Sequence, residues 1–177
     1  MTHRSLTRIA IATAALGALA VAPTAAPGKP AESAATLRIT ADGVGKVKLG
    51  KTFQRLRDQG LVGRLGHFCD AAGDARFSAR LKPPLRGQVD FTRTVPHRAK
   101  FIAVRGGAKA RGVGIGATIP QIRDAFPKAR VDHTTEDVFG ITRVKIPPDG
   151  GGRMQFAVDI QTHKTVVISV PRIQFCE

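Results

Sequence analysis

The fold of this chain is decided by the stretch Arg111-Gly-Val-Gly-Ile-Gly-Ala-Thr-Ile-Pro-Gln-Ile-Arg-Asp-Ala-Phe126. A weaker copy lies earlier, at Gly45-Lys-Val-Lys-Leu-Gly-Lys-Thr-Phe-Gln-Arg-Leu-Arg-Asp58. An offset of 66 residues, which places Gly50 on Gly116, also aligns the threonines and most of the apolar positions of the two stretches. The sequence therefore predicts an internal duplication.

The duplicated unit is longer than the motif. The same offset places the apolar run 101–104 on the apolar run 167–170 without a gap. We therefore expect two tandem pseudo-repeats, at 37–105 and 111–177, joined by a linker at 106–110.

Each copy of the motif is typical of a strand that runs into a short helix. The glycine two residues before each threonine permits backbone angles closed to other residues, and Thr52 and Thr118 then stand at N-cap positions. We expect the helices to stop before Gly60 and Pro127. The glycines do not have the order of a phosphate-binding loop, so a structural turn is the favoured interpretation.

Alternating apolar and polar residues predict strands after each helix. The expected strands are 76–82, 87–92 and 99–105 in the first unit, and 138–146, 154–160 and 165–172 in the second. Short turns between consecutive strands imply antiparallel pairing. The predicted fold class is α+β, with each unit a short helix packed on a three- to four-stranded antiparallel sheet.

The N-terminal residues 1–26 have the composition of a signal peptide. Arg4 and Arg8 form a basic start, and the apolar stretch 9–21 is shorter than the roughly 20 residues that cross a bilayer as a helix. Residues 27–36 are rich in Ala, Pro and Gly and are expected to be a flexible lead. We therefore expect a secreted protein, extracellular or associated with the cell wall, with no transmembrane segment in the mature chain.

The mature chain is strongly basic. Without Arg4 and Arg8 the 28 Lys and Arg residues become 26, against 13 Asp and Glu residues, which gives a net charge of +13. Such a charge attracts nucleic acid, anionic lipid or anionic cell-wall polymer. Export makes nucleic acid an unlikely partner, and no aromatic residues interleave with the basic ones to stack bases. Basic residues scattered along the chain can also simply keep the protein soluble. A site for a polyanion and unspecific solubilising charge therefore both stay open as interpretations.

Two cysteines, Cys69 and Cys176, follow the expected signal peptide. An oxidising compartment and an even count predict that they form a disulfide, which would tie the first unit to the end of the second. The alternative is a catalytic thiol beside His67, but a nucleophile also needs a third group to orient its base.

The pattern Gly-x-Val-x-Leu-Gly-x-Thr-x-x-x-Leu at 45–56, repeated at 112–127 and followed by strands, resembles the tandem modules of the beta-lactamase inhibitory protein family and the single module of the SmpA/OmlA lipoproteins. The resemblance implies a binding module rather than an enzyme. That family carries a disulfide within each module and contact surfaces rich in Tyr and Trp, whereas this chain has two cysteines and no Tyr or Trp. Trp, Tyr and Arg dominate binding at protein interfaces, and of these only Arg is present in this chain. The resemblance therefore assigns no inhibitory residue to this chain.

Catalytic and metal-binding patterns are not found. The four histidines after the leader have no zinc spacing, and there is no nucleophile elbow, so we assign no catalytic, metal-binding or cofactor-binding residues. The dense polar cluster 132–137 is interpreted as a solvated loop between the second helix and its first strand, with cation binding as the alternative.

The predicted function is that of an exported, non-enzymatic protein-interaction module of the inhibitor-like type. The first alternative is a cationic module that binds anionic cell-envelope polymers, and the second is an enzyme of unrecognised type. The candidate basic binding face consists of Arg76, Arg80, Lys82 and Arg86. Its counterpart in the second unit mixes Arg143 and Lys145 with Gln155 and Asp159.

Overall fold

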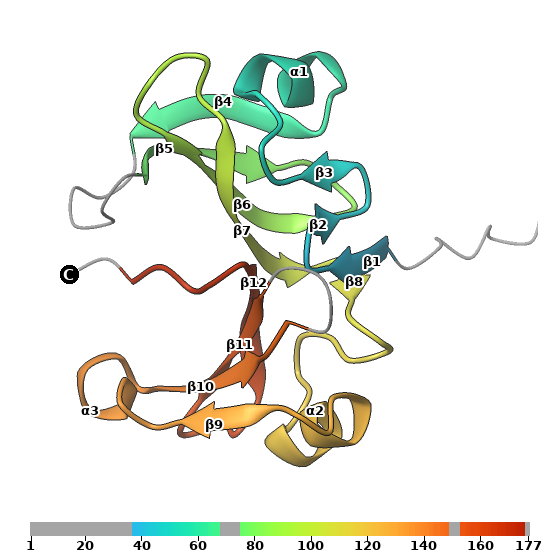
Figure 1. Ribbon diagram of the computed structural model, residues 1–177, viewed down its shortest axis with the longest axis vertical. Coiled ribbons are helices and arrows are strands. Elements are labelled where there is room, and N and C mark those ends of the chain that lie inside the picture. Colours follow the sequence, from blue (N-terminus) through green and yellow to red (C-terminus); the bar gives the residue numbers. More distant parts are fainter. Residues whose placement is uncertain (1–36, 68–74, 149–152, 176–177) are drawn as a thin grey trace, which may run out of the picture. The chain divides into compact units, whose positions relative to one another are not determined.

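The computed structural model describes residues 37–67, 75–148 and 153–175, and for residues 75 and 76 the backbone alone. All of these belong to one unit, Ala35–Glu177. The described chain is mixed α+β, mostly strands, with three short helices and two sheets (Figure 1). The expected signal peptide, Cys69 and Cys176 lie outside the described residues, so the disulfide stays a prediction.

The larger sheet has eight strands, and every neighbouring pair in it is antiparallel. In order across the sheet these are β4 (Val62–His67), β5 (Ala75–Leu81), β6 (Arg86–Thr92), β7 (Ala99–Gly106), β12 (Thr165–Val170), β11 (Met154–Asp159), β10 (Ile141–Ile146) and β9 (Arg130–Asp132). Each half of the chain thus contributes four consecutive strands to one sheet.

The smaller sheet joins short strands from the two halves of the chain. Its order is β3 (Val47–Lys48), β2 (Gly43–Val44), β1 (Leu37–Thr40) and β8 (Ala108–Lys109). β1 pairs antiparallel with β2 and parallel with β8. β3 lies in the strand expected before the first helix, whereas the strand expected before the second helix is only an isolated bridge between Ala110 and Val113. β1, β2 and β8 were not predicted, because strands of two to four residues are too short to show a hydrophobic period.

The first two helices begin at the predicted threonines. α1 spans Phe53–Asp58 directly after Thr52, and α2 spans Ile119–Ala125 directly after Thr118. The glycine two residues before each threonine has a left-handed backbone, with φ of 76° in the first copy and 86° in the second. The helix starts predicted from the motif are confirmed, and a side chain at either glycine would be strained.

Both helices pack on the same face of the larger sheet. Phe53 of α1 meets Phe91 of β6 edge to face, with ring centroids 5.5 Å apart. Phe126, at the end of α2, packs on Phe156 of β11 with centroids 5.8 Å apart. The register of the strands places Phe91 and Phe156 on one side. We call this side the inner face and the opposite side the outer face.

One hydrophobic core occupies the inner face and includes residues of both halves. Its largest fully buried side chains are Phe91, Phe156, Leu56, Ile102, Ile122 and Ile168. Burying a side chain of this size stabilises the fold by about 1.5–3 kcal/mol. Because the core is continuous, removal of a large side chain from either half should destabilise both.

The halves meet where β7 pairs with β12. The paired residues are Ile102 with Val170, Ala103 with Ser169, and Val104 with Ile168. Ser169 is 66 positions after Ala103, so these two counterparts of the offset lie opposite each other. Ile102 pairs with the counterpart of Val104, and Val104 pairs with the counterpart of Ile102. The Ile and Val residues of this junction are fully buried, so separating the two strands would expose apolar surface as well as unpaired backbone groups.

The same backbone hydrogen bonds anchor both motif copies. These are Gly50 N–H to Ala99 O, Ala99 N–H to Lys51 O, Gly116 N–H to Thr165 O and Thr165 N–H to Ala117 O, each 2.8 Å long. Adding 66 to the residue numbers of the first two bonds gives the residue numbers of the last two. In each half, the turn before the helix is thus bound to the start of the fourth strand of that half.

The structure differs from the predicted arrangement in its sheets, in the linker and in the start of one strand. The expected separate sheets are joined into one, and the expected linker at 106–110 contains β8 and the last residue of β7. The expected strand 138–146 begins later, because α3 (Glu136–Phe139) precedes it. Acidic residues favour the first turn of α3, and Gly140 ends it with a left-handed backbone, φ 63°, so that β10 starts at Ile141.

Candidate binding face

The outer face carries polar and small side chains among the apolar ones. Side chains alternate along a strand, so the register assigns to this face Asp90 of β6, Ala103 of β7, Ser169 of β12, Ala157 of β11 and Arg143 of β10. The inner side of the same strands is aliphatic and aromatic. A face of this mixed composition is suited to contact with solvent or a partner.

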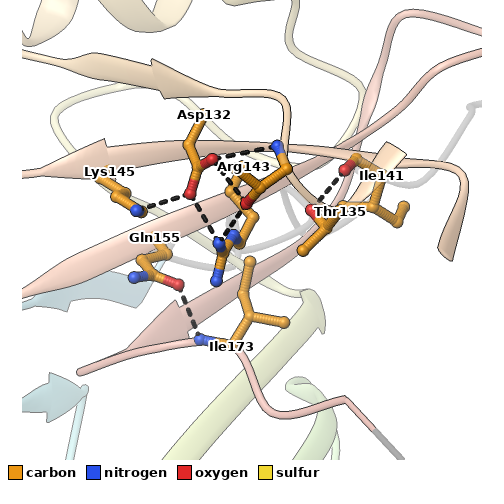
Figure 2. A network of polar contacts seen from close by, with 8 residues as sticks. Asp132, Thr135, Ile141, Arg143, Lys145, Gln155 and Ile173 are labelled. Carbon is orange, nitrogen blue, oxygen red and sulfur yellow. Dashed lines mark hydrogen bonds and ion pairs between the residues drawn. The ribbon is translucent and has the colours of Figure 1, made fainter. Parts of the chain in front are cut away.

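The segment that follows β12 lies against part of the outer face. The Ile173 N–H donates a hydrogen bond of 3.1 Å to the Oε1 atom of Gln155 on β11 (Figure 2). Phe175 stacks on Phe139 of α3 with ring centroids 4.2 Å apart. This segment therefore contacts both β11 and α3.

A hollow of about 410 Å³ opens on the outer face at β6, β7, β12, β11 and β10, and we call it the central hollow. Its lining includes Asp90, Arg105, Ala103, Ala157, Val167, Phe139 and Phe175. Most of these side chains are apolar, and Asp90 and Arg105 add one charge of each sign. The hollow thus has mainly apolar walls, as ligand and partner sites commonly do, and its polar or charged lining residues are Gln88, Asp90, Arg105, Ser169 and Gln174.

Asp90 is the buried carboxyl of the central hollow. Only 2% of the residue is exposed, and among the described residues the side-chain donor that it binds is the Nε2 atom of Gln88, 2.8 Å away. Burial disfavours the charged form and raises the pKa of Asp90 from 3.8 to about 6, although the Gln88 hydrogen bond opposes the rise. Near neutral pH the carboxyl is therefore ionised, and the loss of its hydration makes the charged form less stable than it would be in water.

A second hollow, of about 450 Å³, lies beyond β10, and we call it the basic hollow. Five cationic side chains line it: Arg130, Arg143, Lys145, Arg153 and Arg172. Its apolar lining comes from Ile146, Pro147, Pro148 and Met154. A smaller hollow of about 270 Å³ shares residues with both and lies where they meet. The outer face of the second half is therefore hollowed from its centre toward β9.

Asp132 of β9 holds two of these cations in place (Figure 2). Its Oδ2 atom lies 2.6 Å from Nη2 of Arg143 and 2.5 Å from Nζ of Lys145. Its Oδ1 atom accepts hydrogen bonds from the backbone N–H and the hydroxyl of Thr134, at 3.1 and 2.8 Å. Hydrogen bonds from Lys145 and Thr134 keep the pKa of the Asp132 carboxyl far below its usual range.

The polar cluster 132–137 is not the single loop expected from the sequence, because Asp132 ends β9 and Glu136 begins α3. The Thr142 hydroxyl hydrogen-bonds to Glu136 Oε1, and His133 Nδ1 lies 2.6 Å from the same atom. The Thr142 hydrogen bond, and then that of His133, lower the pKa of Glu136. In the ranges that the structure describes, no three His, Cys, Asp or Glu side chains are arranged to hold a metal ion.

The candidate basic face from the sequence is described only in part. Arg80 is exposed, and its backbone pairs with that of Gln88, a residue that lines the central hollow. Lys82 is exposed just after β5. Arg86 is also exposed, and its guanidinium lies across Gly106, with Nε 2.7 Å from the position of a Cβ there. The side chain of Arg76 lies outside the described residues.

Sequence reasoning missed most of the residues of the two hollows. It placed Arg143 and Lys145 on the outward side of the second sheet, and both line the basic hollow. It did not select Arg130, Arg153 or Arg172, which stand on different segments of the chain. Only the strand register and the path of the segment after β12 bring these three arginines together.

No protein-family model, no curated protein and no solved structure matches this chain. None of the helices in the described ranges has the length and apolar character needed to span a membrane.

Proposed function

We propose that this protein is an exported, non-enzymatic binding protein whose outer face receives a partner protein. The observation that carries the proposal is the central hollow, an apolar depression beside exposed arginines such as Arg105. Protein interfaces combine an apolar centre with a polar border, and Arg is enriched among the residues that contribute most to binding. The outer face offers this combination without Tyr or Trp.

A binding role also agrees with the surroundings of Asp90. This carboxyl has a raised pKa, as a general acid or base would need, yet in the described part of the chain no His, Ser or Cys side chain hydrogen-bonds to it. An enzyme of unrecognised type therefore stays the weakest alternative, with no residues assigned to it.

We also propose that the chain is a tandem pseudo-repeat of inhibitor-like modules. The 66-residue offset between the starts of α1 and α2 and the repeated hydrogen bonds before them support this interpretation. The exchanged pairing of β7 with β12 supports it as well. The proposed export and the proposed Cys69–Cys176 disulfide rest on the sequence.

A cationic module that binds anionic envelope polymers is the second candidate. The basic hollow and the charge of the mature chain favour it. The two candidates respond differently to salt, because exposed charges are screened beyond about 8 Å at physiological ionic strength whereas a packed apolar interface is not.

The test is a pull-down with the tagged mature chain from culture fluid and from cell-wall material, at low and at high salt. Arg105→Glu changes the border of the central hollow, and Arg123→Glu makes the same charge change on an exposed residue of α2. We expect a protein partner that persists at high salt, is lost with Arg105→Glu and is retained by Arg123→Glu. Retention of wall material alone, eluted by salt, would reject the protein partner and support the polymer.

A further inference from the structure

We propose that the basic hollow is a binding site for a small organic phosphate, a compound with a phosphoryl group attached to a non-polar part. The hollow lies between β9, β10, the start of β11 and the segment after β12. Its ligand is separate from the partner proposed for the central hollow, and either proposal can fail without the other.

The cations of the hollow outnumber the carboxylates that they contact among the described residues. Of its five cationic side chains, Arg143 and Lys145 share the carboxylate of Asp132. Arg130, Arg153 and Arg172 are exposed, and none of them pairs with a carboxylate in the described part of the chain. Several positive charges around one small cavity favour an occupant that carries more than one negative charge.

The cations on β10 are held in position before any ligand arrives. Asp132 binds the Nη2 atom of Arg143 at 2.6 Å, and Thr134 Oγ1 accepts from the same atom at 2.9 Å. The Nε atom of Arg143 is buried, and no described residue accepts a hydrogen bond from it. The contacts of Nη2 thus fix the Arg143 side chain at the wall of the hollow before any ligand arrives.

Arg172 is positioned by a different contact. Its guanidinium carbon lies 5.4 Å from the centroid of the Phe101 ring, at the distance of a cation–π interaction. Stacking restrains the planar group and leaves its N–H donors available. Arginine donors at fixed positions suit the tetrahedral oxygens of a phosphoryl group better than a single lysine does.

The size and lining of the hollow indicate that a bare ion would fill it poorly. Its volume of about 450 Å³ is in the range of small-molecule sites, roughly 300–1,000 Å³. Pro147 and Pro148 add apolar lining beside the arginines. We therefore expect the phosphoryl group to meet the guanidinium groups while a non-polar part contacts these two prolines.

The experiment is a calorimetric titration of the mature chain at low ionic strength with phenyl phosphate. Inorganic phosphate tests the charge alone, and benzyl alcohol tests the non-polar part alone. We expect saturable binding of phenyl phosphate, at least fivefold weaker binding of inorganic phosphate, and no saturable binding of benzyl alcohol. Absence of saturable phenyl phosphate binding would overturn the proposal.

A matched pair of variants locates the site. Arg130→Gln with Arg153→Gln removes two exposed cations of the hollow, and Arg57→Gln with Arg123→Gln removes two from α1 and α2. The first pair should weaken phenyl phosphate binding at least tenfold, whereas the second should change it less than twofold. An equal loss in both pairs would mean that overall charge binds the anion, which contradicts a built site.

Two further measurements separate the sources of the phosphoryl group and the two proposals. If the phosphate belongs to a lipid, the protein should bind vesicles of phosphatidylcholine with phosphatidic acid, and phenyl phosphate should displace them. If the protein binds phenyl phosphate but not the vesicles, the ligand is a soluble compound. Vesicle binding that persists in the Arg130/Arg153 variant would contradict the site. The same variant should still capture the protein partner that Arg105→Glu loses.

Discussion

The two halves of the larger sheet resemble each other on the inner face, which contacts the helices, and differ on the outer face. On the inner face, Phe91 in the first half and Phe156 in the second each receive a phenylalanine from the neighbouring helix segment, at 5.5 and 5.8 Å. On the outer face, β9 and β10 carry Asp132, Arg143 and Lys145 in one bonded network around the basic hollow. None of the described residues that line the basic hollow belongs to β4 or β5.

This difference shows which positions the fold constrains. Inner-face residues must fill a shared core, so their size and apolar character are restricted in both halves. Outer-face residues contribute little to that core and can diverge as long as the strand pairing persists. Function is therefore more safely inferred from the outer face, where the halves differ, than from the motif that they share.

The largest expected effect tests the shared inner face. Phe91→Ala and Phe156→Ala should each reduce the free energy of unfolding by about 3–5 kcal/mol, since each leaves a cavity in the same core. Urea unfolding followed by circular dichroism should show one transition for both variants, because β7 and β12 join the halves. If an alanine variant does not fold, Phe91→Leu and Phe156→Leu should be compared instead. Two separate transitions would contradict the continuous core.

The next effect concerns Asp90, the buried acid of the first half. Its raised native pKa means that the folded state binds its proton more tightly than the unfolded state, so the group makes stability fall as the pH rises from about 4 to about 6. Asp90→Asn removes this loss and keeps an oxygen acceptor for Gln88. Relative to the wild type, the variant should gain about 2–3 kcal/mol between pH 3.5 and pH 8. The exposed Asp124→Asn should show no such gain.

A smaller effect of opposite sign is expected in the second half, at Asp132. Because the native pKa of Asp132 is lowered, its carboxylate stabilises the fold at pH values above 3.8, the ordinary pKa of the group. This stabilisation is lost as the pH falls toward the native pKa. Asp132→Asn should reduce the free energy of unfolding by about 1–2 kcal/mol at pH 7, since its ion pairs are partly exposed. Thermal unfolding at pH 7 and pH 3 measures this; the same loss at both values would contradict the role of the carboxylate.

Local signals in the sequence were sufficient for the helix starts and for six of the eight strands of the larger sheet, whereas β4 and β9 were not predicted. Thr52 and Thr118 are identified by the glycine before them and the apolar spacing after them, and both signals act within a few residues. The joining of the two sheets was not predictable, because it depends on one long-range pairing between β7 and β12. α3 was overlooked because apolar Val138 and Phe139 continue the pattern of the strand that follows.

The candidate site was less predictable than the fold. An arginine at 130, 153 or 172 looks like any other exposed basic residue in a chain with 28 Lys and Arg residues. Asp90 carries no signal in the sequence, since its burial results from neighbouring strands and not from nearby residues. The network of Asp132 with Arg143 needs the register of β9 against β10, which is set by tertiary packing.

The difference between the outer faces is tested most directly by amide NMR shifts of the labelled mature chain during titration with phenyl phosphate. If the second half alone carries the anion site, shift changes should gather in β9, β10 and the residues around Arg153 and Arg172, and the amides of β4 to β6 should stay unchanged. Changes spread evenly over the arginines of both halves, or centred on α1 and α2, would contradict a site on the outer face of the second half.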